Sequence, residues 1–150
     1  MANIITTDHL LTETQRALLT AVLDTLVPAN ENGTMPSAAE VGFENFLTTQ
    51  ATDFEADLVS ALEYFDITFV EMPLDGRCQV VMEFSNHNPL LFQNLLARVY
   101  DCYYQHDQVR EQIGMVTGAV FPQGNEVMAG DLSLLDPVLE NRQDHGYRAL

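Results

Sequence analysis

The chain of 150 residues contains no lysine, so its six basic side chains are all arginines. The absence of lysine excludes Schiff-base chemistry and the phosphate-binding lysine of a P-loop. Acidic residues number 22, which gives a formal net charge of -16. Because a nucleic-acid backbone or an anionic membrane surface would repel such a chain, we expect no nucleic-acid partner.

Cysteine is also scarce, with Cys78 and Cys102 as the two in the chain. They have neither the spacing of a metal-binding Cys-x-x-Cys pair nor the density of a disulfide scaffold. We expect each to be buried as a small hydrophobic side chain. In an oxidising compartment, the alternative is that they form a disulfide.

No apolar run approaches the roughly 20 residues that span a bilayer, so we expect no direct membrane insertion. The first residues lack the basic region, the apolar core and the twin arginine of an export signal. The chain as given is therefore expected to be cytoplasmic. It would be periplasmic if an exported partner carried it or if a leader had been removed.

What the sequence does contain is apolar side chains, which make up 47% of it and suffice for one packed core. Their helical spacing, and the scarcity of β-branched alternation, predict an all-α fold. We expect a single domain over 1–150. Its parts are an N-terminal extension at 1–10, a bundle of about five to six helices over 11–114, and an irregular, extended C-terminal arm over 115–150.

Capping signals predict the first two helices. Thr12 and Gln15 form a capping-box pair at the start of a helix that ends near residue 27. After the polar loop 28–36, Ser37 and Glu40 form a second pair, which would open the next helix.

A third helix is predicted from an apolar stripe that begins after Asp53. Its members are spaced by four, four, three and four residues, the period of one continuous helix: Phe54, Leu58, Leu62, Phe65 and Phe69. Of the predicted helices, this one has the most regular pattern.

Two further helices follow. Asp75 can cap a fourth helix, whose apolar positions include Cys78 and Met82. Asn88 and Pro89 are a cap followed by a proline at the first helical position, and they would open a fifth helix. We expect this fifth helix to be central, because apolar side chains cover more than half of its circumference.

A short sixth helix is expected just after two neighbouring tyrosines. Asp107 would cap it, and Gly114 would end it. From Met115 onwards the periodicity is weak, but apolar anchors persist. This arm would either wrap around its own bundle or lie along a partner.

Two residue pairs raise the possibility of a small cysteine or metal enzyme. Cys102 and His106 have the helical spacing of a thiolate-imidazole pair, and Glu83 and His87 have that of two metal ligands. We favour structural roles, since His106 falls in the last turn of a helix, where a cation complements the dipole, and Cys102 lies on the apolar stripe. We therefore predict no catalytic, cofactor-binding or metal-binding residue in this chain.

Several short motifs occur in a recognisable order along the chain. They are AVLDTLVP at 21–28, MPSAAEVG at 35–42, FL at 46–47, YYQHDQVR at 103–110 and IG at 113–114. Together they resemble the gluconate 2-dehydrogenase subunit 3 family, over roughly residues 11 to 125.

The resemblance implies an accessory role. Members of this family bind a large flavoprotein of the glucose-methanol-choline type and help it mature, and in several systems they carry the twin-arginine signal that exports the pair. Catalysis and FAD belong to the large subunit, and a cytochrome subunit often takes the electrons. The implied function is a non-catalytic small subunit of an FAD-dependent sugar or polyol dehydrogenase. The chain departs from the family in having no twin arginine.

We expect the interface with such a partner to combine three parts. They are the loop between Pro28 and Pro36, a tyrosine corner, and the C-terminal arm. A tyrosine buries a large area in an interface and loses the freedom of only a few rotatable bonds. An arginine pairs with carboxylates. The remaining candidates are Tyr103, Tyr104 and Arg110 at the corner, and Phe121, Pro122, Tyr147 and Arg148 in the arm.

Two alternatives to this interface remain open. Tyr103 and Phe121 could instead pack inside the monomer. The whole protein could also be a stand-alone, acidic homo-oligomer with a binding or structural role, in which the arm docks onto a neighbouring copy.

Overall fold

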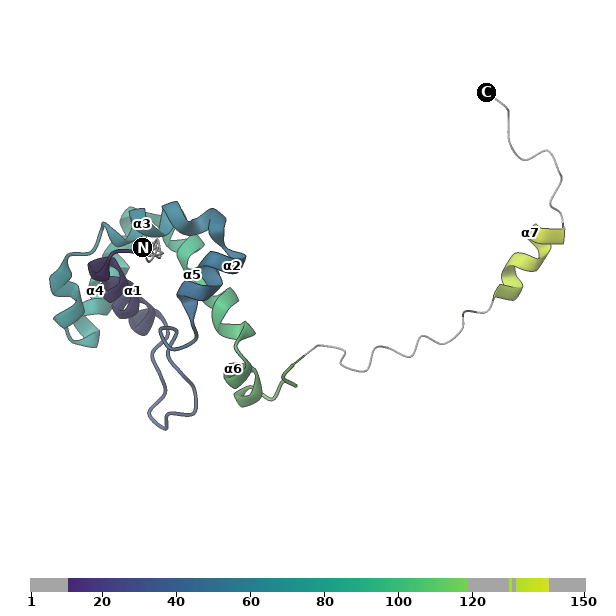
Figure 1. Ribbon diagram of the computed structural model, residues 1–150, viewed down its shortest axis with the longest axis horizontal. Coiled ribbons are helices and arrows are strands. Elements are labelled where there is room, and N and C mark those ends of the chain that lie inside the picture. The colour runs from purple at the N-terminus through teal and green to yellow at the C-terminus, as the bar shows by residue number, and fades with distance from the viewer. Residues whose placement is uncertain (1–10, 119–129, 131, 141–150) are drawn as a thin grey trace, which may run out of the picture. The chain divides into compact units, whose positions relative to one another are not determined.

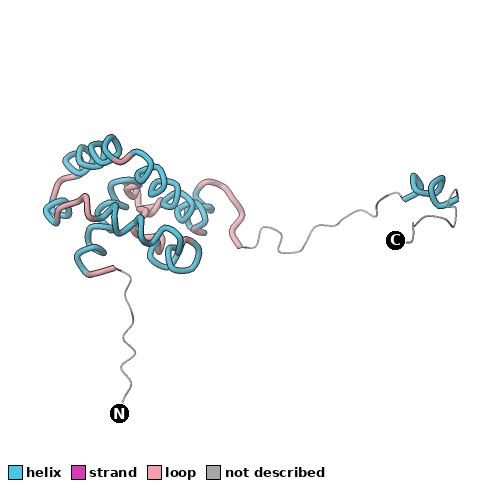
Figure 2. Tube along the Cα trace, turned by 90° about the horizontal axis from the view of Figure 1, so that it is seen from above, coloured by secondary structure: helices cyan, strands magenta, loops and turns pink. Residues whose placement is uncertain are grey.

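The computed structural model describes residues 11–118, 130 and 132–140. In these residues it contains seven α-helices, three 3-10 helices and no strand, which confirms the all-α prediction with slightly more helices than expected (Figure 2). None of the described helices is long and apolar enough to cross a membrane. The chain divides into two units, Met1–Gly118 and Ala119–Leu150, which are described separately.

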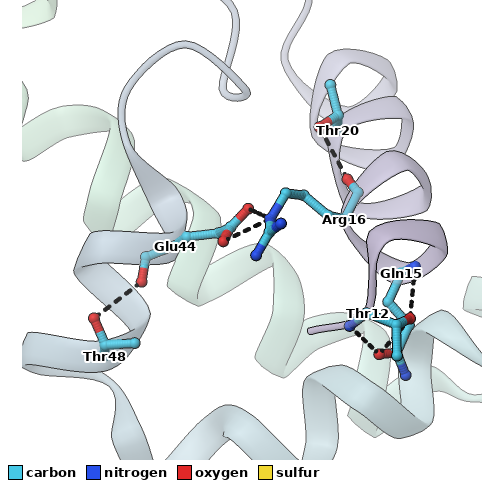
Figure 3. Close-up of polar contacts among 6 residues, drawn as sticks. All are labelled: Thr12, Gln15, Arg16, Thr20, Glu44 and Thr48. Atoms are coloured by element: carbon cyan, nitrogen blue, oxygen red, sulfur yellow. Dashed lines mark hydrogen bonds and ion pairs between the residues drawn. The ribbon is translucent and has the colours of Figure 1, made fainter. Parts of the chain in front are cut away.

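The first helix, α1 (Glu13–Leu26; Figure 1), begins at the predicted capping box. The backbone amide of Gln15 donates to Thr12 Oγ1 at 3.2 Å, and the backbone amide of Thr12 donates to Gln15 Oε1 at 2.9 Å (Figure 3). These bonds satisfy amide groups that the start of a helix leaves without partners. One turn further, Arg16 Nε donates to Glu44 Oε1 at 2.8 Å.

The second helix, α2 (Phe43–Gln50), begins later than predicted. The amide of Ser37 does donate to Glu40 Oε2 at 2.8 Å, but the segment that this bond closes is a turn and not a helix. Gly42 separates the turn from α2 with a φ of 76°, a left-handed conformation that glycine adopts without strain. The prediction of a helix opening at Ser37 was therefore wrong.

The predicted third helix is real but too long. Its stripe is divided among η1 (Thr52–Phe54), α3 (Glu55–Leu62) and η2 (Ile67–Glu71). The chain becomes extended at Asp66, whose carboxylate accepts a bond of 2.9 Å from the amide of Thr68. That backbone hydrogen bond lowers the pKa of Asp66. All five side chains of the stripe are still buried, so the period predicted burial but not helical continuity.

The fourth helix, α4 (Leu74–His87), has Pro73 at its N-cap position, so the prediction that Asp75 caps it was wrong. Asp75 lies in the first turn, where a carboxylate complements the helix dipole. Cys78 and Met82, both expected on the apolar side, are exposed because the face that packs against the core lies further around the helix.

The fifth helix, α5 (Pro89–Gln105), begins at the predicted pair, with Asn88 at the N-cap and Pro89 at the first helical position. Proline fits there because its missing N–H would have no partner in any case. The helix contacts α2, α3 and α4, as expected of the central element. It contributes Leu95 and Val99 to the core.

The sixth helix, α6 (Asp107–Gln112), contacts α5. His106 and not Asp107 holds its N-cap position, which corrects the prediction. The backbone turns at His106 because this residue is extended, with φ of -69° and ψ of 129°.

The end of α6 agrees with the sequence. Gly114 has a φ of 82°, and its amide donates to the carbonyl of Glu111 at 3.0 Å. The amide of Met115 donates to the carbonyl of Arg110 at 2.8 Å. These two bonds form a Schellman motif, in which glycine takes the left-handed position.

The core of the first unit lies among α1, α3, η2, α4 and α5. Around Phe84 it is aromatic, with ring centroids 5.3 Å away in Phe65 and 6.1 Å away in Phe92. The largest fully buried side chains are Phe69, Phe84, Leu19, Leu47, Leu58, Leu62, Leu95, Val22, Val99 and Val109. One packed core therefore holds the six helices of this unit together.

In the second unit, the described residues form η3 (Leu132–Leu135) followed directly by α7 (Asp136–Glu140). The arm that was expected to be irregular thus contains a helical segment. None of the residues of α7 is buried.

Candidate partner-binding surface

The loop 28–36 is held in one conformation by its own hydrogen bonds. The amide of Asn30 donates to the carbonyl of Met35 at 3.2 Å, and the amide of Met35 donates to Asn30 Oδ1 at 3.0 Å. Pro28 is exposed at the start of the loop, and Pro36 is buried at its end. Figure 1 shows the loop projecting at the same end of the bundle as α6.

Tyr103 ties the end of this loop to α5. Its side chain is 3% exposed, and its hydroxyl donates to the carbonyl oxygen of Pro36 at 2.9 Å. Burial raises the pKa of Tyr103, and the neighbouring Tyr104 raises it further, so the hydroxyl stays protonated and remains a donor. The structure therefore places Tyr103, a predicted interface residue, in the interior, where it positions the loop.

Tyr104 has the opposite environment, since 53% of it is exposed. Its ring lies edge-on to Tyr103 with centroids 5.4 Å apart, and 6.0 Å from the ring of Tyr100, which is also exposed. Helical spacing places Tyr100 and Tyr104 on one face of α5. We call this exposed pair the tyrosine pair.

The first turn of α6 also contacts the loop. Gln108 Nε2 donates to the carbonyl oxygen of Thr34 at 3.3 Å. Next to it, Val109 is fully buried and anchors α6 to the core. The loop, the end of α5 and α6 therefore form one continuous surface, although they are distant in sequence.

Arg110 is engaged within the chain. Its Nη2 donates to the carbonyl of Val116 at 2.7 Å, and its Nη1 to that of Gly118 at 3.4 Å. The carboxylate of Asp107 lies 3.5 Å from the same Nη1. Arg110 thus holds the segment that leaves α6, which is a different task from the predicted pairing with a partner's carboxylate.

The arm's part of the predicted interface is Phe121, Pro122, Tyr147 and Arg148, and all four lie outside the described residues. They stay predictions. What the structure brings together is Pro36, Tyr103 and Tyr104. Pro28 instead lines a cavity with Arg77, and Arg110 bonds to the segment that follows α6. Tyr100 and Gln108 belong to this surface but were not predicted, although the spacing of Tyr100 and Tyr104 was a signal for the first of them.

The Cys102 and His106 pair does not have the geometry of a thiolate-imidazole dyad. Cys102 Sγ donates to the carbonyl oxygen of Val41 at 3.8 Å, and burial raises the pKa of its thiol to about 11. Both side chains line a cavity of about 200 Å³ with Asn45 and Gln50. His106 Nδ1 is buried without a hydrogen-bond partner among the described residues. A thiol that stays protonated at neutral pH is a poor nucleophile.

Glu83 and His87 are likewise not arranged as metal ligands. His87 Nδ1 lies 2.7 Å from the backbone carbonyl oxygen of Glu83, so the ring bonds to the helix and not to the carboxylate. The imidazole also lies 6.4 Å from the ring of Tyr64. Within the described part of the chain, no three histidine, cysteine or acidic side chains are grouped so as to hold a metal ion.

A further cavity, of about 310 Å³, lies where α1 ends, and Asp24, Glu40 and Arg77 line it. Arg77 Nη1 donates to the carbonyl of Ala21 at 3.3 Å, near the C-terminal end of α1, whose last turn has no basic residue. A cation complements the dipole at that end. We assign Arg77 this structural role.

No protein-family model, no curated protein and no solved structure matches this chain. The support for a function therefore comes from its motifs and from the geometry described above.

Proposed function

We propose that this chain is a non-catalytic small subunit, which binds a large FAD-dependent dehydrogenase of the glucose-methanol-choline type and helps to mature or stabilise it. The partner would hold the FAD and act on a sugar or polyol, and a cytochrome subunit is a further proposed member of the complex. We propose that the complex assembles in the cytoplasm, and that the chain reaches the periplasm if its partner is exported and carries it. The ordered motifs from residue 21 to residue 114 support this proposal.

The single observation that carries the proposal is the exposed tyrosine pair on α5, next to Tyr103, which ties down the end of the loop. Tyr100 and Tyr104 present two adjacent aromatic rings, and tyrosine is enriched among the residues that dominate binding energies. The loop is tied down by Tyr103 and Gln108 before any partner arrives. A surface ordered in advance loses less conformational entropy on binding.

Charge adds a requirement on the partner's surface. Arg16 and Arg98 are paired with Glu44 and Asp53 within the chain, at 2.8 Å and 2.7 Å. Because the chain carries a formal net charge of -16, its complement is a basic patch. Association should then slow as salt concentration rises.

The first test is whether the neighbouring reading frame encodes a flavoprotein of this type, and the second is co-expression of that flavoprotein with this chain. We expect the two to co-purify, and the double variant Tyr100→Ala/Tyr104→Ala to bind at least ~10-fold more weakly. Leu90→Ala is the matched control, because Leu90 is also an exposed side chain of α5 but lies at its other end.

Two results would contradict the proposal. One is a flavoprotein that acquires FAD and full activity equally well without this chain. The other is a stable oligomer of the chain alone that does not bind the flavoprotein, which would support the homo-oligomer instead.

A further inference from the structure

The helical segment of the second unit has an apolar face that nothing within the segment covers. Its apolar side chains are between 49% and 70% exposed: Leu132, Leu135, Val138 and Leu139. Leu132 and Leu135 are one turn apart in a 3-10 helix, in which residues three apart lie above one another. Leu139 follows one turn later in α7, and Val138 lies beside it.

The polar residues of the segment lie on its other side. Asp136 and Glu140 are four residues apart, which places them on one face of α7 by the period of the helix. Apolar anchors at i, i+3 and i+7, opposite an acidic face, are the pattern of a helix that docks into a groove. Isolated helices shorter than about 12 residues are marginal in water, so this segment needs a partner surface to be stable.

The charge of the chain indicates which surface that is. The Met1–Gly118 unit contains 17 of the 22 acidic residues and four of the six arginines, and the second unit is also net acidic. Electrostatic repulsion therefore opposes docking of the segment onto its own bundle or onto a second copy of the chain. The complementary occupant is another protein, with an apolar groove bordered by lysine or arginine.

We infer that the segment 132–140 is an amphipathic docking helix, which inserts Leu132, Leu135 and Leu139 into an apolar, basic-rimmed groove on the large flavoprotein. This inference rests on the proposed function, because it names the flavoprotein as the partner. It adds a second point of attachment to the tyrosine pair. Two linked sites raise the overall affinity, since the second contact becomes intramolecular once the first has formed.

The experiment uses the full chain and the purified, FAD-loaded flavoprotein, with affinity measured by calorimetry. We expect Leu135→Ser/Leu139→Ser to weaken binding by ~100-fold, and rising salt to weaken the wild-type chain more than this variant. Leu90→Ser is the matched control, because it makes the same change at an exposed leucine of the first unit. Hydrogen exchange should show residues 132–140 protected only in the complex.

The outcomes separate this inference from the proposed function. If the wild-type chain and the double serine variant bind equally tightly, the docking helix is overturned and the accessory role stands. If the wild-type chain does not bind at all, both fail. Protection of residues 132–140 in the isolated chain would overturn the inference in favour of the chain's own bundle. If the wild-type chain forms an oligomer and the double serine variant does not, the inference is overturned in favour of docking onto a second copy of the chain.

Discussion

The hydroxyl of Tyr103 donates a 2.9 Å hydrogen bond to the carbonyl oxygen of Pro36, which lies 67 residues earlier in the chain. This bond joins the last turn of the central helix to the end of the loop 28–36. Tyr104, the next residue along α5, is 53% exposed. The buried hydroxyl of Tyr103 and the exposed tyrosine pair therefore lie at the same end of α5.

Removing this hydroxyl tests its role. Tyr103→Phe keeps the ring but leaves the buried carbonyl of Pro36 without its donor, so we expect the free energy of unfolding to fall by about 1 to 2 kcal/mol. Urea denaturation monitored by circular dichroism would measure it. Tyr104→Phe is the matched control, since it removes the same group from an exposed residue and should change stability by less than about 0.5 kcal/mol. Equal effects would show that the bond contributes nothing specific.

The glycine that ends α6 should resist substitution. Gly114 has a φ of 82°, which side chains rarely adopt, so Gly114→Ala should destabilise the protein by about 1 kcal/mol. Gly76 is the contrast, because it lies within α4 and an added Cβ would meet its neighbours no closer than 3.7 Å. Gly76→Ala should therefore stabilise by about 0.5 to 1 kcal/mol. Melting temperatures that shifted in the same direction for both variants would contradict this contrast between the two glycines.

The two cysteines should differ in reactivity. Cys78 is exposed, whereas Cys102 is buried and burial raises its thiol pKa to about 11. A water-soluble disulfide reagent at neutral pH should therefore modify one thiol quickly, and the second only when the protein unfolds. Cys78→Ala should abolish the fast phase, and Cys102→Ala should leave it unchanged. A fast phase that survives in Cys78→Ala would show an accessible Cys102.

The raised pKa of the Cys102 thiol also predicts that the protein loses stability at alkaline pH. Burial raises the pKa of the thiol to about 11 in the folded protein, against 9.0 for the exposed thiol of the unfolded chain, so only the unfolded state ionises between these values. The contribution is complete below pH 9 and is lost as the pH rises towards 11, by up to about 2 kcal/mol. The difference in stability between the wild-type chain and Cys102→Ala should shrink over that range. A difference that does not depend on pH would contradict the raised pKa.

Local signals predicted local structure well. The capping box of Thr12 and Gln15, the proline that starts α5 and the glycine that ends α6 are where they were expected. Three predicted helix caps were wrong for a common reason. Ser37, Asp75 and Asp107 have side chains that are able to cap a helix, but the backbone enters each helix at another residue.

The candidate surface was predicted less completely than the fold. The sequence indicated the loop and the tyrosine corner, but it left open whether Tyr103 faces a partner, as Tyr104 was expected to, or packs inside the monomer. Their difference depends on Pro36, a partner that periodicity cannot identify. In the same way, Arg110 was expected to face a partner, and its hydrogen bonds to Val116 and Gly118 depend on the path that the chain takes after α6.

By itself the sequence determined the all-α class, most helix positions and the acidic surface, because these follow from spacing, capping chemistry and charge. Only the tertiary structure decided which apolar side chains are covered. It buried Cys102 and exposed Cys78, and it divided the stripe from Phe54 to Phe69 without exposing any member. The physical reason is that the spacing of apolar residues along the chain places their side chains on one face of a helix, whereas the burial of that face depends on what packs against it.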